Sequence, residues 1–159
     1  MILRLTKKDE MIKYKRTNSD DRDFLRLVAE LDEDLRRRDG DEHVFYAQLN
    51  KTDGLPTCIV GYEGEQPVAC GAIRRLDETA VEVKRMYVVP HRRGKGVAAE
   101  VLVELEKWAI ELGYRISRLE TGQRQPEAIA LYKKSGYSIV ENFGKYVGVE
   151  NSVCFEKTL

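Results

Sequence analysis

The sequence has no long run of apolar residues and no excess of charge of either sign. Among its 159 residues, 27 basic side chains balance 27 acidic ones. This balance argues against a protein that grips nucleic acid or a membrane through its overall charge. The apolar runs are far shorter than a bilayer span, and the opening MILRLTKKDE turns polar too soon for a signal peptide. We therefore expect no nucleic-acid or membrane partner, and any charge-driven binding must be local.

Cysteine is also scarce, and the three cysteines are Cys58, Cys70 and Cys154. Their spacing matches no metal-binding motif, and each lies among residues that are typical of strands. An odd number of cysteines in a chain without an export signal favours reduced, buried thiols. We therefore predict a cytoplasmic protein that holds no metal ion.

What the sequence does contain is regular hydrophobic periodicity over the length of one domain. Residues 11–17 alternate as in a strand, and Asn18 or Ser19 is suited to cap a helix that ends at Gly40. Apolar residues at steps of three and four give this helix one buried face. A short second helix is expected around residues 43–49.

From residue 57 the hydrophobic period changes to two, which is typical of strands. Three strands separated by short turns predict an antiparallel meander. The rest of the chain predicts a helix, a strand, a second helix and two closing strands. This order indicates a mixed α/β sheet in a single domain over residues 1–159. The predicted segments are 57–63, 67–76, 80–89, 98–112, 115–122, 126–136, 137–143 and 151–159.

The stretch VVPHRRGKGVAAEVL, residues 88–102, joins the last meander strand to the helix that follows it. The first amides of a helix have no intrahelical partner and lie at the positive end of its dipole, so they form an anion site. Gly94 and Gly96 allow close approach of the backbone and positive φ angles. Three basic side chains add charge, and together these features suit a pyrophosphate. A plain strand-to-helix turn with solvated charges explains the stretch about equally well.

Two common phosphate-binding motifs do not match this turn. The P-loop requires a glycine, four residues and then Gly-Lys-Ser/Thr, but Val97 follows Gly96 and no second glycine has that spacing. The dinucleotide fingerprint requires three glycines after a first parallel strand, whereas only two occur here, after a meander. Neither nucleotide-hydrolase nor dinucleotide binding is therefore predicted.

The segment Arg93–Ala98, RGKGVA, does match the Arg/Gln-x-x-Gly-x-Gly/Ala signature of the GNAT acetyltransferase superfamily. The resemblance extends over most of the chain from Thr57 onward. EVKRMYVVPHRRGKGVAAEVLVELEKWAIELGY resembles that family's fourth strand, pyrophosphate loop and third helix. LETG, AIALYKKSGY and a closing strand pair follow in the family's order.

This resemblance implies a mostly antiparallel central sheet with splayed fourth and fifth strands and helices on both faces. It implies acetyl-CoA as cosubstrate, with the pantetheine arm in the gap between those strands. The Met86 amide would then polarise the thioester carbonyl, and Gln125 stands where many relatives carry an asparagine that contacts the arm. The implied cofactor-binding residues are Met86, Tyr87, Val88, Arg93, Gly94, Lys95, Gly96, Val97, Ala98, Gln125 and Tyr132.

Acetyl transfer to an amine needs a base for the ammonium proton and an acid for the departing thiolate. Tyr132 matches the family's tyrosine beside the sulfur and is the candidate acid, although its helical spacing also fits a core residue. Glu82, four residues before Met86, is the candidate base. A structural ion pair or a solvated strand explains Glu82 equally well. Glu120 and a chain of water molecules are the other candidate bases.

Few residues of the sequence bear on the identity of the acceptor substrate. We predict direct transfer in a ternary complex to a primary amine of a small molecule, such as an amino acid, whose carboxylate Lys84 and Arg85 are suited to meet. The alternative is a catalytically silent acyl-CoA-binding module of the same fold. A homodimer through the last strands is an expectation from relatives. Residues considered for the acceptor pocket are Tyr46, Gln48, Asn50, Phe143, Tyr146 and Asn151.

Overall fold

A computed structural model describes residues 11–40 and 54–159 of the chain. In chain order its strands and α-helices are β1, α1, β2, β3, β4, α3, β5, α4, β6 and β7. The helix expected around His43–Leu49 lies outside the described residues. The bounds are β1 Lys13–Thr17, α1 Arg22–Asp39, β2 Thr57–Glu63, β3 Gln66–Arg75, β4 Ala80–Val88, α3 Val97–Glu111, β5 Ile116–Gly122, α4 Pro126–Lys134, β6 Ser138–Val140 and β7 Ser152–Thr158.

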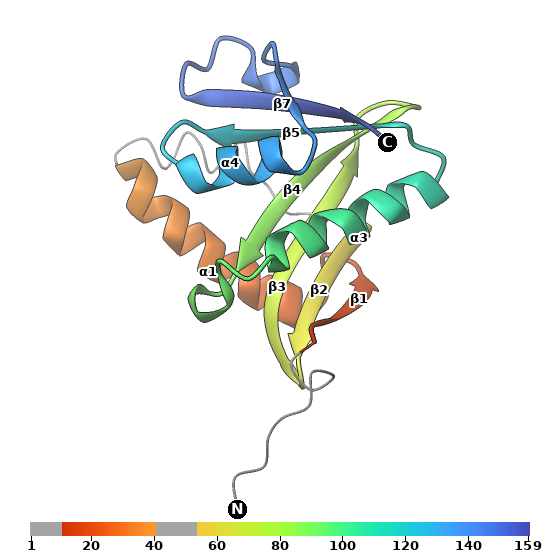
Figure 1. Ribbon diagram of the computed structural model, residues 1–159, viewed down its shortest axis with the longest axis vertical. Coiled ribbons are helices and arrows are strands. Elements are labelled where there is room, and N and C mark those ends of the chain that lie inside the picture. Colours follow the sequence, from red (N-terminus) through yellow and green to blue (C-terminus); the bar gives the residue numbers. More distant parts are fainter. Residues whose placement is uncertain (1–10, 41–53) are drawn as a thin grey trace, which may run out of the picture.

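All seven strands form one sheet in the order β1-β2-β3-β4-β5-β7-β6 (Figure 1). Strands β2, β3 and β4 pair antiparallel, as the period-two pattern and the short turns between them predict. Strand β1 also pairs antiparallel with β2, although α1 lies between them in the chain. The pairing of β4 with β5 is parallel, and α3 makes the crossover between them. The remaining pairs, β5 with β7 and β7 with β6, are antiparallel. The predicted mixed sheet is therefore confirmed.

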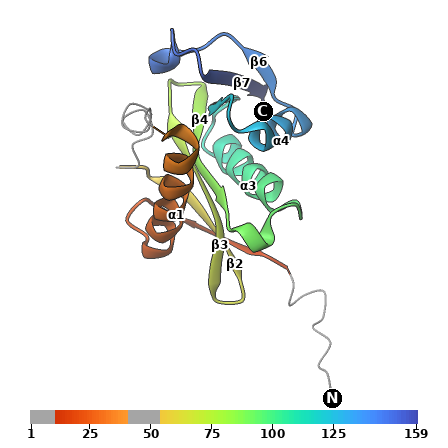
Figure 2. The ribbon, with the colours of Figure 1, turned by 90° about the vertical axis from the view of Figure 1, so that its left-hand side faces the viewer.

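Helices cover both faces of this sheet, as Figure 2 shows with α1 on one side and α3 and α4 on the other. Phe24 and Leu27 of α1 pack in a core with Val60 and Val68 of the sheet. On the opposite face α3 and α4 build a second core with the sheet, because their apolar residues recur at helical spacing. Residues of this second core include Ile59, Ile73, Val101, Leu102, Leu105, Tyr132 and Phe155.

The N-cap of α1 corrects the sequence prediction. The capping residue is Asp21, whose Oδ1 accepts hydrogen bonds from the backbone amides of Asp23 at 2.9 Å and Phe24 at 3.1 Å. Asn18 instead accepts from the backbone of a nearby residue, and Ser19 Oγ accepts from the Leu55 amide at 3.0 Å. Both predicted caps are therefore occupied in anchoring the chain ahead of the helix.

Candidate functional site

Strands β4 and β5 separate partway along their length. Their pairing runs only from Ala80–Ile116 to Val83–Leu119, although β4 continues to Val88 and β5 to Gly122. The space opened in this way belongs to a cavity of about 790 Å³, which we call the splay cavity. Its size is typical of a site for a small molecule or cofactor.

A bulge in β4 forms part of the wall of the splay cavity. One residue of β3, Gly71, lies opposite two residues of β4, Arg85 and Met86. Arg85 has a φ of 59°, the only positive φ of a non-glycine residue in the described chain. A Cβ at Gly71 would lie 2.7 Å from Met86 Sδ and 2.9 Å from carbon atoms of Leu105 and Val101, so only glycine leaves room for the bulge. An isolated glycine within a strand is a sign of a bulge, and this signal in the sequence was missed.

The glycine-rich turn forms another part of the wall. Gly94 and Gly96 have φ values of 73° and 81°, which confirms the expected need for glycine at both positions. Gly96 caps α3, and within residues 11–40 and 54–159 no side-chain cap accepts a hydrogen bond from the first amides of that helix. A Cβ at either glycine would meet open space. The start of α3 therefore presents backbone donors to the cavity, which is the geometry of an anion site.

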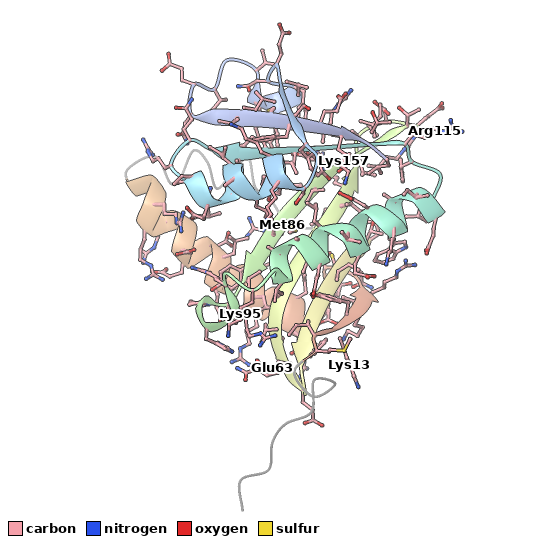
Figure 3. All side chains as sticks on the ribbon, in the orientation of Figure 1. Lys13, Glu63, Met86, Lys95, Arg115 and Lys157 are labelled. Carbon is pink, nitrogen blue, oxygen red and sulfur yellow. The ribbon has the colours of Figure 1, made fainter. Side chains whose placement is uncertain are left out.

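The arginine side chains of the turn contact neighbouring groups of the protein. The Arg93 Nε donates to the Val88 carbonyl at 2.8 Å, and its guanidinium lies 5.5 Å from the centre of the Tyr87 ring. An Nη atom of Arg93 is also 3.5 Å from an Asp34 carboxylate oxygen on α1. Figure 3 labels Lys95 in this turn, and Lys95 does not line the splay cavity. Backbone amides are thus better placed than these side chains to hold an anion.

Most of the residues predicted from the sequence meet in the splay cavity. Met86, which Figure 3 labels, lies on β4 at the bulge and packs against the core that α3 and α4 build with the sheet. Gln125 precedes α4, whose first residue is Pro126, and lies in the wall as well. Of the predicted cofactor and catalytic residues, those lining the cavity are Glu82, Met86, Tyr87, Val88, Arg93, Gly94, Gly96, Val97, Ala98, Gln125 and Tyr132.

Tyr132 packs in the core and also lines the splay cavity. Only 6% of the residue is exposed, and its ring packs 6.0 Å from that of Tyr137 and 5.8 Å from that of Phe155. No hydrogen bond to its hydroxyl occurs within the described residues, whereas the Tyr137 hydroxyl bonds with Ser117 and Glu106. Burial, aided by the charge of Glu120, raises the pKa of Tyr132. The phenol therefore stays protonated at neutral pH and can act as a donor.

Glu82 is an ion-pair partner as well as a cavity residue. It is 1% exposed, and one carboxylate oxygen accepts from Arg74 on β3 at 2.7 Å. The other oxygen accepts from the Tyr146 hydroxyl at 2.6 Å. Arg74 could not be predicted as this partner from the sequence, because a cross-strand partner depends on the register of the hairpin. Both oxygens of Glu82 are therefore engaged within the protein.

Glu120 and Lys84 have strongly shifted pKa values. The pKa of Glu120 is raised to about 7, chiefly by burial and also by the charge of Glu82, while the Ser152 side chain and the charge of Lys84 act in the opposite direction. Burial lowers the pKa of Lys84 to about 8, although the charge of Glu82 opposes this. Both side chains line the splay cavity. A carboxyl group that titrates near neutral pH is matched to accepting a proton under physiological conditions.

The acceptor candidates are only partly brought together. Tyr146 and Asn151 line the splay cavity, while Phe143 packs 5.5 Å from the Tyr146 ring without lining it. Lys84 and Arg85 are buried rather than surface charges, and Arg85 forms an ion pair with Asp32 of α1. Tyr46, Gln48 and Asn50 lie outside the described residues. The acceptor side thus combines a phenol, an amide and two buried cations.

The described residues contain no group of three or more histidine, cysteine or acidic side chains that could hold a metal ion. All three cysteines are buried, and burial raises the pKa of each thiol. In the same residues, no helix is both long and apolar enough to span a bilayer.

Comparison with known proteins supports the resemblance noted in the sequence. Residues 19–137 match the acetyltransferase (GNAT) family. A protein of Azospirillum brasilense named IAA acetyltransferase is 35% identical over 140 residues, which are 83% of this chain and 90% of that protein. An uncharacterised N-acetyltransferase of Bacillus subtilis, YsnE, is 35% identical over 100 residues, which are 62% of this chain and 66% of its own.

Solved structures agree with these sequence matches. A candidate acyl-CoA N-acyltransferase from Klebsiella pneumoniae superposes with a TM-score of 0.78 at 30% identity, covering 94% of this chain and 99% of its own. The PaiA N-acetyltransferase of Thermoplasma acidophilum was solved in complex with coenzyme A. It superposes with a TM-score of 0.67 at 14% identity, covering 94% of this chain and 99% of its own. The second likeness establishes a shared fold alone.

Proposed function

Since the chain belongs to the acetyltransferase (GNAT) family, we propose that it transfers the acetyl group of acetyl-CoA directly to the primary amine of a small molecule. One observation carries the proposal. The splay cavity is walled both by the start of α3, with its backbone donors, and by the proton-handling groups Tyr132 and Glu120. Phosphates and a reacting thioester therefore have complementary surroundings within one site.

The roles that we propose begin with the thioester. The backbone amide of Met86, in the bulge of β4, polarises the thioester carbonyl and stabilises the oxyanion that forms on attack. Tyr132 protonates the departing thiolate. Glu120 removes the proton from the ammonium group of the acceptor, since its carboxyl group titrates near neutral pH. Both carboxylate oxygens of Glu82 are engaged, by Arg74 and by Tyr146, so Glu82 acts through Glu120 rather than on the acceptor.

The acceptor that we propose carries a carboxylate, as an amino acid or a related metabolite does. Lys84 and Arg85 are buried cations in the cavity wall, and a buried cation favours an anionic group on its ligand. The Tyr146 ring and the Asn151 amide add apolar and hydrogen-bonding surface beside them. A zwitterionic acceptor would present its carboxylate to Lys84 and its amine to the thioester.

An amine panel tests this function. Release of free thiol from acetyl-CoA is measured with amino acids, with the matching amino acid amides, and with amines that lack a carboxylate. We expect turnover with at least one amino acid and a value of kcat/KM about tenfold lower for its amide, because the amide loses a charge-assisted hydrogen bond. Binding of acetyl-CoA without turnover of any amine would instead support the silent binding module.

The pH dependence of kcat/KM for the acceptor amine tests the assignment of Glu120 as the base. We expect kcat/KM to fall as the pH drops below about 7, because protonated Glu120 cannot accept a proton from the acceptor. Glu120→Gln should lower kcat about 100-fold and abolish this acid limb. Glu82→Gln should instead move the limb to lower pH, since the charge of Glu82 raises the pKa of Glu120. The profile is followed by initial rates at saturating acetyl-CoA.

The two variants control for each other. If Glu82→Gln removed the acid limb and Glu120→Gln kept it, Glu82 would be the base. If both variants kept the wild-type limb, a chain of water molecules would be the better assignment.

A further inference from the structure

Lys84 is an unusual lysine in that it lies in the wall of the splay cavity with only 5% of its surface exposed. Among the residues that the structure describes, it is the one buried lysine. It stands two residues before Met86 on β4, and Tyr132 lines the same cavity. A lysine amine therefore shares the cavity in which the proposed function places the thioester.

The charges that face Lys84 come from four elements. Glu82 of β4 and Glu120 of β5 are acidic residues, while Arg74 of β3 and Lys145, after β6, are basic. The pKa of Lys84 is lowered to about 8, mainly by burial, with Lys145 and Arg74 acting in the same direction and Glu82 opposing them. Roughly one tenth of the amine is then neutral at pH 7, against well under one hundredth for an ordinary lysine.

We propose that Lys84 is a site of self-acetylation, which accepts the acetyl group of bound acetyl-CoA when no acceptor occupies the splay cavity. This inference rests on the proposed function, because that function supplies the thioester. The lone pair of the neutral Nζ attacks the thioester carbonyl carbon, and the carbon–sulfur bond breaks. The departing CoA sulfur takes up the proton that the amine loses. The products are Nε-acetyl-Lys84 and the free thiol of coenzyme A, and no other reactant is needed.

Acetylation of Lys84 has a direct consequence for the enzyme. It removes a cation that the proposed function assigns to the carboxylate of the acceptor, so the modified protein should bind that acceptor more weakly. Conversely, a bound acceptor carboxylate keeps Lys84 protonated and occupies the adjacent space. The acceptor therefore protects the lysine, and an enzyme with acetyl-CoA but no acceptor inactivates itself.

Peptide mass spectrometry of the full-length protein, incubated with acetyl-CoA alone, tests this inference. We expect acetyl-Lys84 to form at least about tenfold faster than acetyl-Lys95, because Lys95 is exposed and lies outside the wall of the cavity in which the proposed function places the thioester. The rate at Lys84 should rise about tenfold between about pH 7 and pH 9 and then level off. Coenzyme A in excess, or an amine found active in the panel, should suppress the reaction.

Lys84→Arg is the matched variant, since it keeps the positive charge and cannot form the amide. Its affinity for coenzyme A, measured by calorimetry, should stay within about twofold of the wild-type value. Modification of Lys84 no faster than of Lys95 would overturn the inference. Turnover of an amine with Lys84 left unmodified after prolonged incubation would overturn it too, while the proposed function would stand. Failure of acetyl-CoA to bind would overturn the proposed function itself.

Discussion

Replacing Tyr132 by phenylalanine is expected to lower kcat about 100-fold while the KM for acetyl-CoA stays nearly constant. Tyr132 is buried and lines the splay cavity, its pKa is raised, and no hydrogen bond to its hydroxyl occurs within the described residues. Removing it deprives the departing thiolate of its proton donor but leaves the ring and its packing in place. The measurement is the steady-state rate of thiol release with an active amine.

Tyr137→Phe is the matched control for this variant. Tyr137 is a buried tyrosine packed against Tyr132, but its hydroxyl bonds with Ser117 at 2.7 Å and Glu106 at 3.0 Å and does not line the cavity. We expect the control to lose about 1 kcal/mol of unfolding free energy and to keep its kcat. Equal values of kcat for Tyr132→Phe and the wild type would assign the protonation step to water.

Replacing Gly96 by valine is expected to weaken the binding of coenzyme A about 50-fold. The φ of 81° at Gly96 lies in a region that costs a branched side chain about 1–3 kcal/mol. A Cβ at this position meets open space, so the strain is relieved by rotation of the backbone rather than by repacking. That rotation turns the first amides of α3 away from the bound phosphates. Isothermal titration with coenzyme A measures the change.

Gly64→Val provides the same strain away from the site. Gly64 lies in the turn between β2 and β3 with a φ of 60°, and its Cβ also meets open space. Both variants should lose similar unfolding free energy in urea, whereas only Gly96→Val should bind coenzyme A more weakly. Unchanged affinity of Gly96→Val would remove the pyrophosphate site from the start of α3.

Local patterns in the sequence predicted much of the fold. The change of period at residue 57 predicted the meander, and the glycine spacing before α3 predicted a turn with positive φ angles. These features depend on residues that are close in the chain, so the sequence displays them directly. The cytoplasmic location, the homodimer and the single domain stay predictions.

The polar contacts of the site were harder to predict, because they join residues that are distant in the chain. The pair of Arg74 with Glu82 depends on the hairpin register, and the bond from Tyr146 to Glu82 spans 64 positions. The burial of Lys84 depends on segments far from it in the chain, since α1 packs against β4 and Lys145 lies close to Lys84. Alternation along β4 gave no sign of that cover, so a solvated strand explained the same residues equally well.

The hydrogen bond between Tyr146 and Glu82 bears on the engineering of this protein. It fastens the segment between β6 and β7 to the middle of the sheet, and the same segment supplies Asn151 to the cavity wall. A graft of this segment from a relative, made to alter acceptor choice, would therefore also replace Tyr146, whose hydroxyl donates to the buried carboxylate of Glu82. Grafts without a phenol at position 146 leave that oxygen unsatisfied and alter the electrostatic potential around Glu120. Under the proposed function, this bond therefore couples acceptor choice to proton transfer.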